Sequence, residues 1–349
     1  MKAKLLLLLI SIIVALFLGE VILRLIKYDL TFIIALNSFH TGDKELGWVG
    51  VPNFFGRFKR PEFDVVITSN ENGFRRVKSN TGKKENAAKI AFLGDSFTWG
   101  WGVDNESTFA HKLQQMLGED YDVENYGMSG YGNVQELILF KRILSKSSAP
   151  AHLFVMIFKN DFMENIGSIK QSHPFYNIDK GEIVLKNFPV KNPLGNWFTN
   201  FRRKSYVLTF LAYGIDSFQD WRRRRGMKGQ VIDGSRHQEE VSEKSQAVMQ
   251  HVLNEFKLIC LKHGIDLTIV YIPCINDFHT QTPYRKSITQ IAKELNLSYI
   301  DLTDAFQDKV DTYYFKGDGH WNGQGHALAA KVMKRYLDGH LGMCQEQVN

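Results

Sequence analysis

One serine and one Asp–His pair have the residue types and the surroundings of a nucleophilic catalytic site. Ser96 lies in the segment GDSFTWGWGV, directly after an apolar run of strand character, and α/β enzymes often place nucleophiles at such turns. A serine hydroxyl is a poor nucleophile until a base takes its proton. Asp318 and His320 lie two residues apart in FKGDGHWNGQGH, so in an extended segment their side chains point the same way. The pattern predicts that Asp318 orients His320 and that His320 activates Ser96.

Each of these residues also has a purely structural interpretation. Ser96 alone is as typical of a helix cap as of a nucleophile. The segment NDFHT places Asp277 and His279 at the same spacing after another strand-like run, which makes that pair a rival for the base. We favour Asp318 and His320 because a Trp-Asn-Gly segment follows directly and leads into the last predicted helix.

Two further segments supply donors for an oxyanion hole. NYGMSGYGN contains Gly130, whose missing side chain lets its N–H approach a ligand closely. FKND contains Asn160, whose side-chain amide carries two donors. Together with the N–H of Ser96 they can surround one oxygen with donors. A turn glycine or a strand-end asparagine is more often structural, so this prediction depends on their convergence.

The elements that must position these residues alternate between strands and helices from Ala88 onward. Strand patterns cover 89–93, 121–126, 152–158, 266–273 and 298–302, and helix patterns cover 106–117, 133–145, 239–264, 284–296 and 325–337. This alternation predicts a parallel sheet with helices on both faces. The candidate residues follow predicted strands or lie in a terminal loop, and such positions converge at the carboxyl ends of the strands.

The N-terminal segment MKAKLLLLLISIIVALFLG predicts a membrane helix. Two lysines precede an uncharged apolar run that ends at Gly19. The span becomes long enough if Glu20 and Arg24, four residues apart, pair at the bilayer edge. A signal peptide is the alternative, but no small-x-small cleavage site follows. We therefore expect an uncleaved anchor at 1–27, with the bulk of the chain periplasmic or extracellular.

The remainder divides into a linker and lead-in region at 28–85 and a main domain at 86–342. At about 162–236 the strand–helix alternation is interrupted by a hairpin-like segment and an amphipathic helix. Insertions of this size usually cover the active-site end of the sheet. The insertion's helix ends in four arginines, 222–225. We favour a solvated helix end for them and keep contact with anionic lipid head groups as the alternative.

Composition excludes several other classes. The chain has 349 residues, 44% of them hydrophobic, and a net charge of +6; no basic motif interleaved with aromatics indicates a nucleic-acid partner. Its three cysteines, Cys260, Cys274 and Cys344, are too few and odd in number for a disulfide scaffold. No ligand spacing indicates a metal site, and we expect no cofactor.

In chain order the candidate residues are Ser, Gly, Asn and His, and this order resembles the SGNH (GDSL-type) hydrolase superfamily over residues 88–340. GDSFTWGWGV and DGHWNGQGH carry the most specific resemblance, and FDVVITSNENGFR resembles the lead-in of membrane-anchored bacterial members. The resemblance implies a flavodoxin-like three-layer α/β/α sandwich. It also implies a role for each residue: Ser96 as nucleophile, His320 as base, Asp318 as its orienting carboxylate, and Gly130 and Asn160 as oxyanion-hole donors beside the Ser96 N–H.

Two departures from the family pattern affect the expected substrate. Phe158 stands where many members have a glycine two residues before the Asn, which would alter pocket width. The Asp lies two rather than three residues before the His, which is similar to the polysaccharide O-acetyltransferase branch. Trp99 and Trp101 flank the nucleophile turn and suit either a sugar ring or, more commonly, core packing.

These observations predict a serine-dependent ester hydrolase or O-acyltransferase that acts through an acyl-enzyme on carbohydrate O-acyl esters outside the cytoplasmic membrane. Lipid esters and other small esters are the nearest alternative substrates. A non-catalytic glycan-binding or scaffold protein of the same fold is the alternative from another class.

Overall fold

The structure is a computed structural model that describes residues 2–25, 39–78, 82, 84–167, 172–191, 193, 205–226 and 241–346. Parts of the predicted anchor at 1–27, of the lead-in region at 28–85 and of the insertion at 162–236 therefore lie outside the described residues.

The central sheet has five parallel strands in the order β11-β10-β7-β5-β6. In chain order they are β5 (Ala88–Leu93), β6 (Tyr121–Asn125), β7 (His152–Ile157), β10 (Asp266–Tyr271) and β11 (Ser298–Asp301). Ile90 pairs with Val123 on one side and with His152 on the other, so the chain reverses its winding direction beside β5. This is the doubly wound order of flavodoxin-like folds, whose ligands bind at that reversal.

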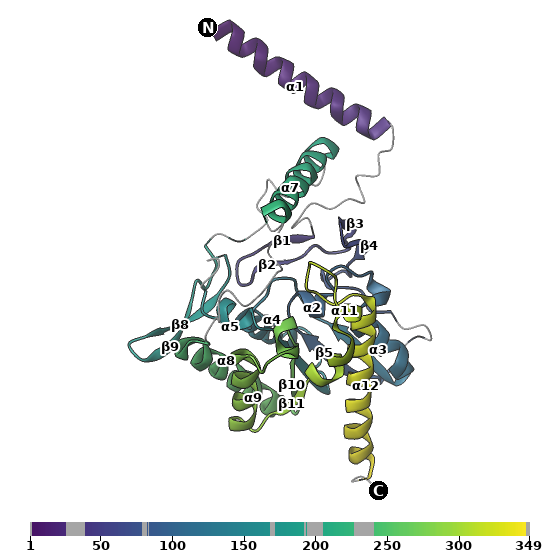
Figure 1. The fold of residues 1–349 in the computed structure, drawn as a ribbon, viewed down its shortest axis with the longest axis vertical. Helices are drawn as coiled ribbons and strands as arrows, with labels where there is room; N and C mark the ends of the chain where they lie inside the picture. The colour runs from purple at the N-terminus through teal and green to yellow at the C-terminus, as the bar shows by residue number, and fades with distance from the viewer. Residues whose placement is uncertain are drawn as a thin grey trace.

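Helices cover both faces of the sheet (Figure 1). One face carries α3 (Phe109–Leu117) and α12 (Gly323–Glu346). The other carries α4 (Asn133–Leu144), α8 (Glu243–His263) and α9 (Pro283–Glu294). Successive strand residues alternate between these two cores, as when Phe92 and Phe154 stack with ring centroids 4.8 Å apart on the α3 side. The predicted α/β/α sandwich and its parallel sheet are thus confirmed.

The other described elements are short or lie outside the sheet. Hairpins form from β1 (His40–Asp43) with β2 (Gly47–Gly50), β3 (Phe55–Arg60) with β4 (Phe63–Thr68), and β8 (Phe175–Asp179) with β9 (Glu182–Lys186). The short helices are α2 (Ser96–Trp99), α5 (Asp161–Glu164), α10 (Thr303–Phe306) and α11 (Val310–Tyr313). The long helix α1 (Lys2–Leu25) projects from one end of the molecule, and α7 (Tyr206–Gly226) lies between it and the β1–β4 hairpins (Figure 1). Within the insertion, the expected hairpin and helix are β8–β9 and α7.

The lead-in region packs against the main domain through buried Arg75. Its guanidinium donates to the carbonyls of Gly100 and Val103 at 3.1 and 2.8 Å and to the Asn105 side chain at 2.9 Å. It also lies over the Trp99 ring, 4.9 Å from the centroid. This one side chain therefore ties the lead-in to the loop that follows the nucleophile turn.

Candidate active site

Ser96 is the first residue of the short helix α2, at the carboxyl end of β5. The preceding Asp95 caps the helix, because its carboxylate accepts the N–H of Phe97 at 2.9 Å. Gly94 makes the sharp turn possible: a Cβ there would lie 2.0 Å from the Thr98 hydroxyl oxygen. Ser96 stays partly exposed while Asp95 is buried, so the turn presents the hydroxyl to a ligand.

The structure brings the three proposed triad residues into one hydrogen-bonded line. Ser96 Oγ lies 2.8 Å from His320 Nε2, and His320 Nδ1 lies 2.6 Å from Asp318 Oδ1. Burial raises the pKa of Asp318, but hydrogen bonds from His320 and Trp101 outweigh it and bring that pKa below its ordinary value. The carboxylate is therefore ionised and holds the imidazole with its other nitrogen toward Ser96.

Aromatic rings enclose the imidazole on two sides. The Trp101 ring stacks on His320 with centroids 5.5 Å apart at 29°, and the Phe97 ring lies 4.9 Å from it. The Trp101 indole N–H also donates to Asp318 Oδ2 at 3.3 Å. Trp99, in contrast, is a core residue, 3% exposed and stacked on Phe39. The sequence did not predict the contact between Trp101 and Asp318, because the two residues are 217 positions apart and no local pattern links them.

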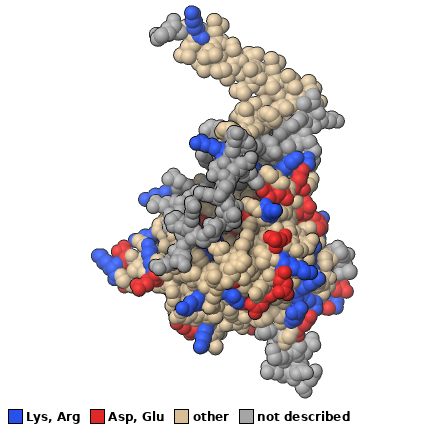
Figure 2. Space-filling model, in the orientation of Figure 1, with Lys and Arg blue, Asp and Glu red and all other residues tan. Residues whose placement is uncertain are grey.

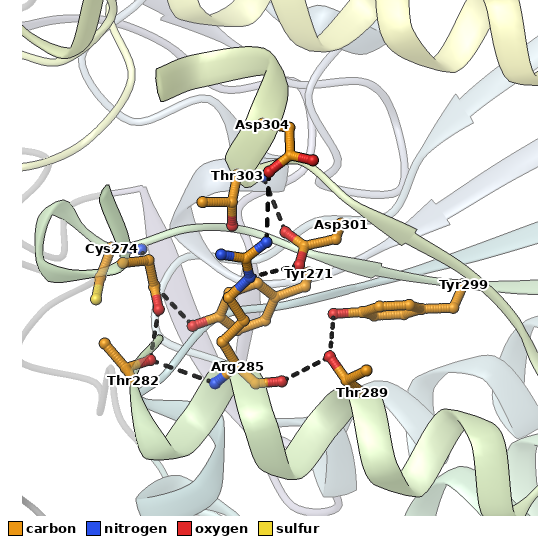
Figure 3. Close-up of polar contacts among 10 residues, drawn as sticks. Tyr271, Cys274, Thr282, Arg285, Thr289, Tyr299, Asp301, Thr303 and Asp304 are labelled. Atoms are coloured by element: carbon orange, nitrogen blue, oxygen red, sulfur yellow. Dashed lines mark hydrogen bonds and ion pairs between the residues drawn. The ribbon is translucent and has the colours of Figure 1, made fainter. Parts of the chain in front are cut away.

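The rival Asp277–His279 pair does not assemble. Asp277 accepts hydrogen bonds from the Tyr271 hydroxyl and the Cys274 N–H at 2.8 Å each, and from the Thr282 hydroxyl. Among the described residues no hydrogen bond joins it to His279. Figure 3 shows Tyr271, Cys274 and Thr282 gathered at this point, where the loop after β10 meets the start of α9. Asp277 therefore organises a loop rather than a histidine.

The two candidate oxyanion donors lie on loops beside the nucleophile turn. Asn160 precedes α5 at the end of β7, and its side-chain amide acts against the rise that burial causes in the pKa of Asp95. That amide carries two donors that a ligand oxygen can use. Gly130 is exposed and adopts a positive φ of 81°, and nearby Met128 donates its N–H to the Gly94 carbonyl at 2.9 Å. The Met128 hydrogen bond therefore attaches the Gly130 loop to the turn that carries Ser96, and Asn160 lies near Asp95 of the same turn.

Three buried carboxyl groups behind the nucleophile turn were not foreseen. Asp95, Glu136 and Asp161 are each at most 2% exposed. Burial raises the pKa of all three, that of Glu136 to about 8. Two of them have one signal in the sequence, which is adjacency to a candidate residue: Asp95 precedes Ser96 and Asp161 follows Asn160, whereas Glu136 has no such neighbour. Raised pKa values favour the neutral acids, which are cheaper to bury than carboxylates.

The described residues contain no group of three or more His, Cys, Asp or Glu side chains arranged to hold a metal ion. Cys260 and Cys274 are buried free thiols, as expected for small core residues. The side chain of Cys344 lies outside the described residues.

Solved structures of several hydrolases are similar to this chain at low identity. A member of the lipolytic protein G-D-S-L family from Veillonella parvula is 14% identical, with a TM-score of 0.40 over 70% of this chain and 95% of that one. The acetyl xylan esterase AlAXEase is 15% identical, with a TM-score of 0.40 over 71% and 99%. A carbohydrate acetylesterase family member from Sinorhizobium meliloti is 12% identical, with a TM-score of 0.40 over 73% and 99%.

No curated protein matches the sequence at a significant level. Residues 90–180, which run from β5 through β8 and its turn, match the family model described as GDSL-like Lipase/Acylhydrolase. That match, with the doubly wound sheet and the Ser96–His320–Asp318 line, supports the assignment of this chain to the GDSL (SGNH) hydrolase superfamily.

Proposed function

We propose that the protein is a serine-dependent ester hydrolase or O-acyltransferase that works through an acyl-enzyme. The observation that carries the proposal is the continuous hydrogen-bonded line from Ser96 Oγ through His320 to Asp318. The Ser96 hydroxyl lies 2.8 Å from the imidazole, and the carboxylate binds the other imidazole nitrogen. This arrangement allows proton transfer during nucleophilic attack.

In the first half-reaction, Ser96 Oγ attacks the ester carbonyl carbon while His320 Nε2 takes the hydroxyl proton. The carbonyl oxygen becomes an oxyanion, which the N–H groups of Ser96 and Gly130 and the Asn160 amide stabilise. The bond to the alcohol oxygen then breaks, and His320 returns its proton to that oxygen. In the second half-reaction, His320 deprotonates water or an acceptor hydroxyl, which attacks the acyl carbon and restores Ser96.

Carbohydrate O-acyl esters are the proposed substrates. The Asp-x-His spacing supports this choice, since it is similar to the O-acetyltransferase branch. Phe158 lies two residues before Asn160, and its ring packs 4.6 Å from that of Phe97; we propose that it takes up space in the acyl pocket, which favours a short acyl group. Longer lipid acyl chains would need that space.

Anchoring by α1 is part of the same proposal. Residues Ala3–Leu25 form one helix with mean hydropathy 2.9 in its most apolar window, none of which is buried. Near its end Glu20 and Arg24 form an ion pair at 2.6 Å, which suits a bilayer boundary. The two N-terminal lysines favour a cytoplasmic N-terminus, with the catalytic domain on the other side.

The test uses the full chain in detergent with p-nitrophenyl acetate and with acetylated sugars. Ser96→Ala should reduce kcat by on the order of 10⁴ or more, whereas Ser129→Ala on the neighbouring loop should not. Intact mass after a rapid quench should show the acyl group on wild type and not on Ser96→Ala. Equal rates for Ser96→Ala and wild type would favour the glycan-binding or scaffold alternative. A preference for long-chain esters would overturn the proposed substrate class.

A further inference from the structure

Helix α7 begins next to the end of α1, where the Glu20 side chain binds its first residues. Glu20 of α1 accepts the N–H groups of Tyr206 and Val207 at 3.1 and 3.0 Å and the Ser205 hydroxyl at 2.8 Å. The first N–H groups of a helix have no partner within it and form the positive end of its dipole. A carboxylate from a segment 185 residues away thus caps α7, so the start of α7 is fixed relative to α1.

Two further contacts bring the helices together. The Arg24 guanidinium lies over the Tyr206 ring, 4.9 Å from its centroid. Gly19 faces Val207 so closely that a Cβ on it would lie 3.2 Å from the Val207 side chain. Among the described residues, α1 is the main packing partner of α7, and Figure 1 shows α7 crossing beside the end of α1 rather than continuing its line.

Beyond its first turn α7 exposes an apolar face. Phe210, Leu211, Ile215 and Phe218 are 44–60% exposed. Leu211, Ile215 and Phe218 follow the spacing that places side chains on one face of a helix. The helix ends in a run of four arginines, of which Arg222 is described and exposed. An exposed apolar face is typical of helices that lie in a bilayer interface, and cations beside such a face are attracted to anionic lipid head groups.

We propose that α7 lies on the surface of the bilayer that holds α1, with this apolar face in the lipid interface. The inference rests on the proposed anchoring by α1. Figure 2 shows that the visible face of α1 is almost uncharged away from its N-terminal end, and Glu20 lies close to the end of that span. The cap therefore starts α7 at the membrane boundary, where its apolar face meets lipid and Arg222 meets anionic head groups.

The test places one environment-sensitive fluorophore at a time on the full chain, with Cys344 replaced by Ser and the other two cysteines buried. The labelled positions are Phe218→Cys on α7, Leu8→Cys on α1, and Leu261→Cys as an exposed apolar control on α8. Each protein is reconstituted into phosphatidylcholine–phosphatidylglycerol vesicles with and without nitroxide-labelled lipid. The probes at positions 8 and 218 should be quenched, and the probe at 261 should not.

A quenched probe at position 8 with an unquenched one at 218 would overturn the α7 proposal and leave the anchor intact. An unquenched probe at position 8 would refute the anchor, and with it the inference. A probe at 218 that is shielded from water but not quenched would mean that a second copy of the chain covers the face, which also overturns the proposal. Gly19→Leu should weaken quenching at 218 while leaving position 8 unchanged; unchanged quenching at 218 would refute the role of the α1–α7 contact.

Discussion

Replacing Trp101 by Phe tests whether the indole N–H positions the catalytic pair. The substitution keeps a ring against His320, where the stacked centroids are 5.5 Å apart, and removes the 3.3 Å hydrogen bond to Asp318 Oδ2. A hydrogen bond to a charged group contributes about 1.5–3 kcal/mol, and one this long lies at or below the lower end of that range. A loss of about 1 kcal/mol corresponds to about a fivefold lower kcat.

The pH profile should change as well, with a defined sign. The Trp101 hydrogen bond is one of the contacts that bring the pKa of Asp318 below its ordinary value. Without it the pKa of Asp318 rises. The acidic limb of kcat/KM should therefore move to higher pH.

The assay is hydrolysis of p-nitrophenyl acetate across the pH range, with Trp99→Phe as the matched control. Trp99 is buried against Phe39 and makes no described contact with Asp318, so its replacement should lower Tm without moving the pH profile. Two results would show that the Trp101 N–H does not position Asp318. One is an unchanged kcat and an unchanged acidic limb of kcat/KM in Trp101→Phe, and the other is an equal shift of that limb in Trp99→Phe.

Three further outcomes follow from the site. Asn160→Ala should lower kcat by on the order of 10²–10³ with little change in KM; a near wild-type kcat would exclude that amide from the oxyanion hole. His320→Ala should abolish ester hydrolysis while His279→Ala retains it, and the reverse would move the base to the other loop. Burial raises the pKa of Glu136 to about 8 from 4.5, so the fold holds a proton that the unfolded chain has released, and this contribution to stability falls as pH rises between those values. Glu136→Gln mimics the neutral acid, so its Tm should fall less than that of wild type as pH rises through this window. An equal dependence of Tm on pH in both proteins would contradict a protonated Glu136.

Much of the fold follows from local patterns. The predicted strand at 89–93 corresponds to β5 (Ala88–Leu93), and the helix pattern at 133–145 to α4 (Asn133–Leu144). These elements are regular because short apolar strands alternate with amphipathic helices, so propensity and burial favour the same assignment. The positions of Ser96 and Asn160 follow from the same pattern, because both come directly after strands of a parallel sheet.

The missed features depend on contacts between distant segments. The indole N–H of Trp101 meets Asp318 only after the last loop folds over the nucleophile turn. Glu136 lies in the first turn of α4, where a carboxylate usually complements the helix dipole, and only the packed structure shows that it is buried. The cap that Glu20 provides for α7 likewise joins segments whose local patterns are independent of each other.

The packing of the lead-in region has a practical consequence for any version of this protein that lacks α1. Phe39 is 3% exposed and stacks on Trp99 with centroids 4.6 Å apart, and Arg75 holds the carbonyls of Gly100 and Val103. A fragment that begins at β5 would lack Phe39 and Arg75. It would therefore lose their contacts with Trp99 and with the loop that carries Trp101. A form that lacks α1 and is intended for activity should begin upstream of Phe39, because the lead-in residues from Phe39 to Arg75 pack against the segment that follows Ser96.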